Sequence, residues 1–196
     1  MLWADFINSY ARDWRTGDEG KAEDRLLNRE WVRRWLAGNH LPPLEAPEGD
    51  ELAELQRLRS ALFAIVRTLA AGGSLSEEQL ALLNREMALG PALRRIAADP
   101  EGRLELVSEP LRDDWAQVRA EIAASLAEAV TTGDPSRFGV CENPDCQWVY
   151  YDDTRNRSKR YCEDKTCGNL LKVRRFRARK KAEAASPPPA GKPCEE

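Results

Sequence analysis

Apolar residues recur at helical spacing through most of the first two-thirds of the chain. Five segments place them three or four positions apart, as amphipathic helices do. These segments run from Leu2 to Trp14, from Arg25 to Leu36, from Asp50 to Leu69, from Ser76 to about Leu89 and from about Leu111 to Val130. Asp50 is expected to cap the third helix. Ser76, with Gln79 three residues on, forms a capping box for the fourth.

Between the fourth and fifth helices the pattern changes to short, partly alternating runs. Residues 93–97 and 103–107 flank Asp99-Pro100-Glu101-Gly102, a good turn sequence, and predict a β-hairpin. Gly133-Asp134-Pro135 ends the fifth helix and marks a domain boundary. We therefore expect a mainly α fold with a small β-hairpin (α+β). Its parts are a multihelical domain over residues 1–135, a small module over 136–182 and a disordered tail over 183–196.

Composition indicates a globular protein in a reducing compartment. Of 196 residues, 42% are hydrophobic and 32% charged, and no apolar run approaches the ~20 residues that span a bilayer. The N-terminus lacks the basic region of a signal peptide. We expect a cytoplasmic location with no membrane partner, where thiols stay reduced and paired cysteines indicate metal rather than disulfides.

Two matched cysteine pairs are the strongest chemical signal. Cys141 and Cys146 enclose four residues, as do Cys162 and Cys167. Four soft thiolates suit tetrahedral zinc, and a site with four protein ligands is structural rather than catalytic. Iron in an all-sulfur site stays an alternative. Cys194, in the tail, is interpreted as a spare thiol.

The net charge of −3 hides an asymmetry along the chain. Residues 1–154 hold 17 basic and 28 acidic side chains, a net of −11, whereas residues 155–181 hold 12 basic and two acidic, a net of +10. After Cys167, residues 168–181 are expected to form a basic helix. Its apolar stripe of Leu170, Val173 and Phe176 is expected to pack on the zinc knuckle, the turn that holds each cysteine pair. This excess indicates a phosphate-binding surface. The predicted DNA contacts are Arg155, Arg157, Lys159, Arg160, Lys172, Arg174, Arg175, Arg177 and Arg179.

Other interpretations of this region stay open. The basic helix could be a solvated face that offsets the acidic body and the thiolates. Tyr150, Tyr151 and Tyr161 could stack on bases, although aromatic residues of so small a module are more often its core. The module could instead bind RNA or an acidic protein surface. One short helix reads few bases, which favours a homodimer on two half-sites.

The cysteine spacing, the run Asp152-x-Thr-Arg-Asn-Arg-Ser-Lys-Arg-Tyr-Cys162, and Gly168-Asn169 after Cys167 resemble the CGNR zinc finger. Residues 5–9, Asp-Phe-Ile-Asn-Ser, resemble the opening of the ABATE domain that usually precedes that finger. Such proteins are described as stress-induced bacterial transcription regulators. The resemblance implies that the four cysteines bind zinc and that Gly168 and Asn169 shape the helix start. Leu170 stands where the family has Arg, so one phosphate contact could be missing.

The N-terminal domain is expected to be an effector domain, by analogy with the family. Asp5 and Asn8 share a helix face and could line a small-molecule pocket, or they could form local hydrogen bonds. Trp31, Trp35 and Trp115 lie on helical stripes and are expected in the core. An enzyme is not expected, because His40 is the only histidine and lies in a loop, and the sequence carries no nucleophile triad or phosphate-binding glycine motif.

Overall fold

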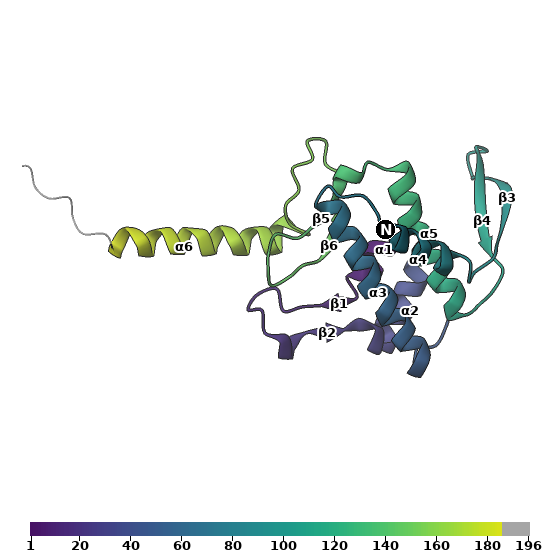
Figure 1. The fold of residues 1–196 in the computed structure, drawn as a ribbon, viewed down its shortest axis with the longest axis horizontal. Helices are drawn as coiled ribbons and strands as arrows, with labels where there is room; N and C mark the ends of the chain where they lie inside the picture. Colours follow the sequence, from purple (N-terminus) through teal and green to yellow (C-terminus); the bar gives the residue numbers. More distant parts are fainter. Residues whose placement is uncertain (186–196) are drawn as a thin grey trace, which may run out of the picture.

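The computed structural model describes residues 1–185 (Figure 1). The expected disordered tail from Ser186 onward, with Cys194, lies outside these residues, while residues 183–185 continue the last helix. The helices are α1 (Leu2–Ile7), α2 (Arg29–Gly38), α3 (Gly49–Ala70), α4 (Glu77–Met87), α5 (Trp115–Thr132) and α6 (Asn169–Ala185). The strands are β1 (Tyr10–Ala11), β2 (Glu23–Asp24), β3 (Ala92–Ala98), β4 (Leu104–Pro110), β5 (Phe138–Val140) and β6 (Val149–Tyr151). The fold is mainly helical with small antiparallel strand pairs, as expected.

The core lies among α1, α2, α3 and α5 and continues into the cysteine module. Its fully buried side chains include Phe6, Leu55, Leu62, Ile122 and Leu126. Phe138 of β5 and Val149 of β6 belong to the same apolar cluster, and the Phe138 ring packs 5.3 Å from that of Trp3. The module therefore rests on the helical body through shared apolar contacts. Trp35 and Trp115 are buried, and Trp31 stacks on Trp35, as the helical stripes predict.

The first helix is shorter than its apolar stripe predicts. It ends at Ile7, and the chain turns so that β1 pairs with β2. The prediction of a helix to Trp14 was wrong because Ser9 has long-range partners. Its carbonyl accepts from the Arg25 amide at 2.9 Å, and its hydroxyl accepts from the Arg59 guanidinium at 2.9 Å. Ser9 is fully buried, and these bonds satisfy its polar groups. A helix that continued past Ile7 would move Ser9 away from both partners.

Three other helix starts differ from expectation. α2 starts at Arg29 rather than Arg25, because Arg25–Leu27 form a separate 3-10 turn and the Asn28 side chain then accepts from the Trp31 amide at 3.0 Å and caps the helix. α3 starts at Gly49, so Asp50 lies in the first turn and is not the cap; the preceding Glu48 pairs with Arg29 instead. α5 starts at Trp115 rather than near Leu111, because the Asp114 carboxylate accepts from the Gln117 amide at 2.9 Å and caps the helix there.

The capping box and the hairpin are confirmed. The Ser76 hydroxyl accepts from the Gln79 amide and the Gln79 side chain accepts from the Ser76 amide. β3 and β4 pair in register from Ala92↔Pro110 to Ala98↔Leu104. Figure 1 shows this hairpin and α6 projecting at opposite ends of the molecule. No helix between residues 1 and 185 has both the length and the apolar character that crossing a membrane demands.

Candidate metal centre and basic helix

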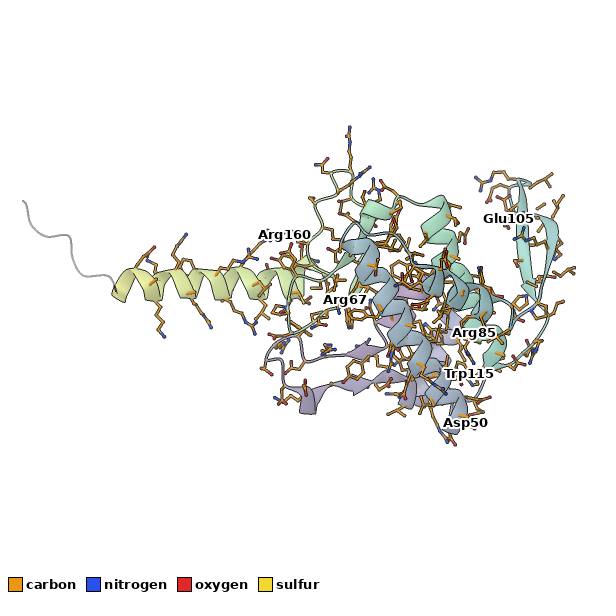
Figure 2. All side chains as sticks on the ribbon, viewed as in Figure 1. Asp50, Arg67, Arg85, Glu105, Trp115 and Arg160 are labelled. Atoms are coloured by element: carbon orange, nitrogen blue, oxygen red, sulfur yellow. The ribbon has the colours of Figure 1, made fainter. Side chains whose placement is uncertain are left out.

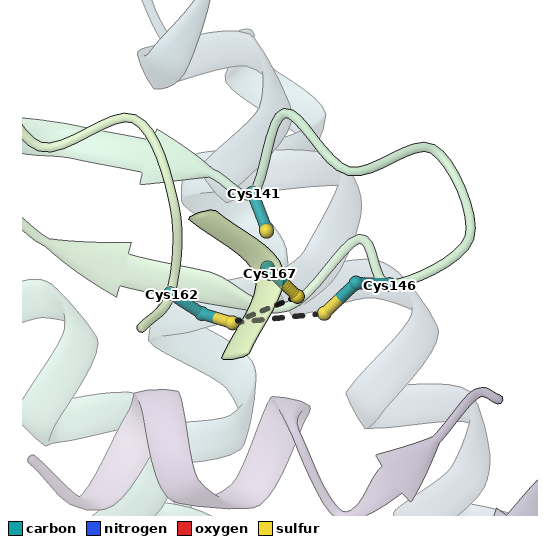
Figure 3. A group of neighbouring side chains, drawn as sticks. All are labelled: Cys141, Cys146, Cys162 and Cys167. Atoms are coloured by element: carbon teal, nitrogen blue, oxygen red, sulfur yellow. Dashed lines mark hydrogen bonds between the residues drawn. The ribbon is translucent and has the colours of Figure 1, made fainter. Parts of the chain in front are cut away.

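The four predicted cysteines meet at one point (Figure 3). Their sulfur atoms all lie within 4.8 Å of one another. The Cys146–Cys162 and Cys162–Cys167 sulfur pairs are 3.7 and 3.8 Å apart. A tetrahedron with Zn–S bonds of ~2.3 Å has edges of about 3.8 Å, so the cluster already has the size of a four-thiolate zinc site. Cys141, Cys146 and Cys167 are buried and Cys162 is partly buried. Four protein ligands fill a tetrahedral zinc site and leave no coordination position for a substrate.

Local backbone structure brings each cysteine to this point. Cys141 follows β5, and its amide donates to the Trp148 carbonyl at 2.8 Å across the knuckle. The Asn143-Pro144-Asp145 turn closes when the Cys146 amide donates to the Asn143 carbonyl at 2.9 Å. The second pair is held beside the first by the Glu142 amide, which donates to the Arg160 carbonyl at 3.0 Å. Cys167 lies in a π-helical turn, Asp164–Gly168.

Thiol chemistry supports a divalent ion in this cluster. Hydrogen bonds from the Cys146 and Cys162 thiols lower the pKa of Cys141, so this thiol ionises first. Hydrogen bonding to that thiolate raises the pKa of Cys146 and, further, that of Cys162. Without a metal, hydrogen bonding within the cluster therefore keeps these two thiols protonated. A 2+ ion stabilises all four thiolates together, and the residues fit one structural zinc ion.

Asn143 supports the centre in a way that the sequence analysis missed. The sequence Asn143-Pro144-Asp145 is typical of a tight turn and gives no sign of a further role, but the Asn143 side chain is fully buried. Its Nδ2 donates to the Cys167 sulfur at 3.4 Å and to the Trp14 carbonyl at 2.8 Å. The same amide therefore orients one ligand and ties the cysteine module to the loop after β1. Trp14 itself packs against the cysteine cluster with Trp148, Tyr161 and Leu171.

The basic helix begins where the cysteine module ends. α6 carries seven basic side chains and one acidic residue, Glu183, and Figure 1 shows it extending away from the body. Its expected apolar stripe does not pack on the knuckle: Val173 and Phe176 are 46% and 52% exposed. Leu171 packs there instead. The π-helical turn holds more residues than an α-turn and so changes which side of α6 faces the cysteines.

The predicted DNA contacts divide by their partners. Four form ion pairs inside the chain: Arg157 with Asp134, Arg160 with Glu142, Arg174 with Asp145, and Arg179 with Glu183. Two others have aromatic partners: Arg175 donates to the Tyr161 hydroxyl at 2.5 Å, and the Lys159 ammonium lies over the Tyr150 ring. Arg155, Lys172 and Arg177 form no ion pair within residues 1–185. Figure 2 shows Arg160 at the base of α6.

The aromatic residues of the module serve its own structure. Tyr161 is buried against the cysteines. The Tyr150 hydroxyl donates to the Lys159 carbonyl at 2.8 Å, and the Tyr151 hydroxyl accepts from the Asp134 amide at 2.7 Å. Leu170 is half-buried at the start of α6. Arg174 and Arg175, which could replace the family's Arg, are held by Asp145 and Tyr161.

Asp5 and Asn8 both border a pocket that Arg25, Trp31 and Trp148 also line, but their polar partners differ. Asp5 is exposed and its carboxylate lies 3.5 Å from the N-terminal ammonium. The Asn8 amide group donates to the Val149 carbonyl at 2.9 Å and accepts from the Val149 amide at 2.8 Å. The Asn8 side chain thus pairs with the edge of β6 as a neighbouring strand would. This pairing joins α1 to the cysteine module.

Comparison with protein families matches both parts of the chain. Residues 137–180 match the CGNR zinc finger. Residues 1–133 match the ABATE family, described as "Putative stress-induced transcription regulator". No curated protein is similar enough to the chain to count as a relative. Because one family covers well over half of the 196 residues and the finger covers most of the rest, the chain belongs to the ABATE family and carries a CGNR zinc finger that binds one structural zinc ion.

Proposed function

We propose that this protein regulates transcription by binding duplex DNA through its zinc-anchored basic helix. One observation carries the proposal: α6 leaves the body with seven basic side chains against one acid, although the body is acidic overall. The −2 charge of a four-thiolate zinc centre accounts for only part of this excess. A helix of this diameter fits the major groove, and its lysines and arginines would neutralise phosphates.

The ion pairs of the module are compatible with this role. Glu142 and Arg160 are 42% and 58% exposed, and Arg157 and Asp134 are similarly accessible. Exposed pairs contribute roughly 0–1 kcal/mol, so their arginines can exchange a carboxylate for a phosphate at little cost. Among the described residues, Lys172 and Arg177 have no such pair to break. We further propose that two copies bind two half-sites, because one helix contacts few bases.

Salt-dependent binding tests the proposal. Zinc-loaded full-length protein is titrated with a mixed-sequence DNA duplex at several salt concentrations, with single-stranded RNA as a competitor. We expect the affinity for the duplex to fall steeply as the salt concentration rises, with a linear plot of log affinity against log salt. Each phosphate contact releases a counterion, which gives this dependence. Preferential displacement by RNA would favour the alternative, an RNA-interaction module. Absence of salt-sensitive binding to either polymer would contradict the proposal and point to a protein partner.

We also propose that the helical domain senses a small molecule. A cavity at its junction with the cysteine module supports this role, since a ligand there would contact both parts of the chain. Calorimetric titration of the zinc-loaded protein with benzoate tests this role, and no binding would count against it.

A further inference from the structure

A cavity of about 260 Å³ lies where the helical body meets the zinc module. Its walls come from three places in the sequence: the α1–β1 segment, the middle of α3, and the Cys146-Gln147-Trp148 end of the knuckle. The volume is at the small end of ligand-binding pockets and suits one ring or two fused rings with a short substituent.

One part of the cavity is apolar. Ile7, Phe63 and Trp148 contribute side chains that can enclose a flat ring, and aromatic walls favour stacked or edge-on contact with another ring. Asn8 also borders the cavity and uses its oxygen and one amide hydrogen on Val149. The Ser60 hydroxyl and the Gln147 amide nitrogen donate to backbone carbonyls, and the charged side chains of the lining are arginines.

The charge of the lining is unbalanced. It contains two arginines and neither aspartate nor glutamate. Arg59 is neutralised by Asp24, whose two carboxylate oxygens each lie 2.6 Å from a guanidinium nitrogen. Arg12 is exposed and forms no ion pair within the described residues. Both guanidinium groups lie over the Tyr10 ring, at 5.4 and 5.6 Å from its centroid. The Cys146 sulfur belongs to the metal centre and is not a free anion.

We propose that this cavity binds a small aromatic carboxylate, with its ring between Phe63 and Trp148 and its carboxylate on the Arg12 guanidinium. A planar carboxylate matches the paired donors of arginine, and the apolar walls hold the ring. This inference rests on the proposed sensing role of the helical domain and names the ligand class of that role.

The cavity is connected to α6 through the residues that follow Arg12. The Trp14 carbonyl accepts from Asn143, which also contacts the zinc ligand Cys167. The Arg15 carbonyl accepts from Arg174 of α6 at 2.6 Å. A ligand that holds Arg12 in place therefore also orders the segment that positions the knuckle and the first turns of the basic helix. Ligand binding should change DNA affinity by this route.

Calorimetric titration of the zinc-loaded full-length protein tests the site. The probes are benzoate and 1-naphthoate, with benzamide as the neutral analogue of benzoate. Arg12→Gln removes the proposed anchor, and Arg33→Gln, at an exposed position of α2, is the charge-matched control. We expect the carboxylates to bind, benzamide to bind at least 10-fold more weakly, and Arg12→Gln to lose at least 10-fold in carboxylate affinity while Arg33→Gln behaves as wild type. No binding of either carboxylate, equal binding of benzamide, or an unaffected Arg12→Gln variant would overturn the proposal.

DNA binding is measured separately, with and without saturating 1-naphthoate. A protein that binds the probe but never binds DNA would contradict the DNA-binding role and leave the cavity assignment standing. A protein that binds DNA but no carboxylate would contradict the cavity assignment and leave the DNA-binding role standing. A DNA affinity that changes with 1-naphthoate in the wild type but not in Arg12→Gln would support the connection through Trp14 and Arg15.

Discussion

Arg174 of α6 lies with its guanidinium 2.8 Å from the Asp145 carboxylate of the first zinc knuckle. A second nitrogen of the same group donates to the Arg15 carbonyl. One arginine thus joins three segments that are far apart in the sequence: the loop after β1, the metal knuckle and the basic helix. Because Asp145 and Arg174 are both partly shielded from solvent, this contact fixes the direction in which α6 leaves the body.

Replacing Asp145 by Asn tests this role. Charge alone would make the variant bind DNA more tightly, since one negative charge is lost. We expect the opposite, because the start of α6 loses its anchor and the helix must be ordered on binding. Amide hydrogen exchange should rise in the first turns of α6. The matched control is Glu183→Gln, which removes one charge from the exposed far end and should slightly raise affinity. Tighter binding of Asp145→Asn with unchanged exchange would contradict the account.

The zinc centre should bind metal with proton release. The pKa values of Cys146 and Cys162 are raised in the metal-free cluster, so both thiols carry protons at neutral pH that the metal must displace. Apparent zinc affinity should therefore fall as the pH is lowered. Calorimetry in buffers of different ionisation enthalpy measures the released protons, and Cys146→Ser is the control that removes one of them. Zinc uptake without proton release would show that the thiols are already ionised.

The buried Arg59–Asp24 pair makes a separate prediction about stability. Both side chains are about one-tenth exposed. Asp24→Asn should cost about 3–5 kcal/mol in the free energy of unfolding, because Arg59 stays buried without its counter-charge. The double variant Asp24→Leu/Arg59→Met should recover most of this loss. Urea denaturation measures both, and a neutral Asp24→Asn would contradict the prediction.

The Arg59–Asp24 pair also makes the free energy of unfolding depend on pH. Burial alone would raise the pKa of Asp24, but hydrogen bonds and charge from Arg59, with a hydrogen bond from Gln56, hold it below its ordinary value. A lowered folded-state pKa stabilises the protein above the unfolded value of ~3.9, and this contribution is lost as the pH falls through the folded pKa. Asp24→Asn should remove that part of the acid sensitivity.

Asn8 and Asp5 are expected to differ sharply. Asn8→Ala leaves the Val149 amide and carbonyl without partners and should cost roughly 2–6 kcal/mol, given about 1–3 kcal/mol for each of the two unsatisfied buried groups. Asp5→Ala removes an exposed group and should change stability by less than about 0.5 kcal/mol. Thermal and urea unfolding compare the two variants, and similar values would show that the Asn8 bridge does not hold the module to the body.

The hairpin carries apolar side chains that nothing in the described chain covers. Ile96 and Leu106 lie directly opposite each other and are 70% and 67% exposed. Ile96→Thr should therefore change the free energy of unfolding by less than about 1 kcal/mol, since threonine also suits a strand. Ile65→Thr, at a fully buried position of α3, is the matched control and should cost several times more. A large loss in Ile96→Thr would mean that this face is covered in solution.

Sequence reasoning identified features that depend on neighbours along the chain. The cysteine pairs, the capping box at Ser76 and the hairpin turn each encode their geometry within a few residues. It failed where distant residues decide the structure. The helix from Leu2 ends early because Ser9 bonds to Arg25 and Arg59, and Asn8 finds its partner 141 residues away. Spacing also misassigned the packing face of α6, since the π-helical turn before it is not visible in the apolar pattern.

Three cations of α6, Lys172, Arg177 and Lys181, form no ion pair within residues 1–185, and the salt dependence of DNA binding tests their role most directly. We compare the zinc-loaded wild type with Lys172→Gln/Arg177→Gln/Lys181→Gln on α6 and with the charge-matched Arg33→Gln/Arg34→Gln/Arg94→Gln on the body. The account predicts that only the α6 variant loses affinity and that its log–log salt slope becomes shallower by about 2–3, as expected for three lost phosphate contacts. Equal slopes for all three proteins would contradict it.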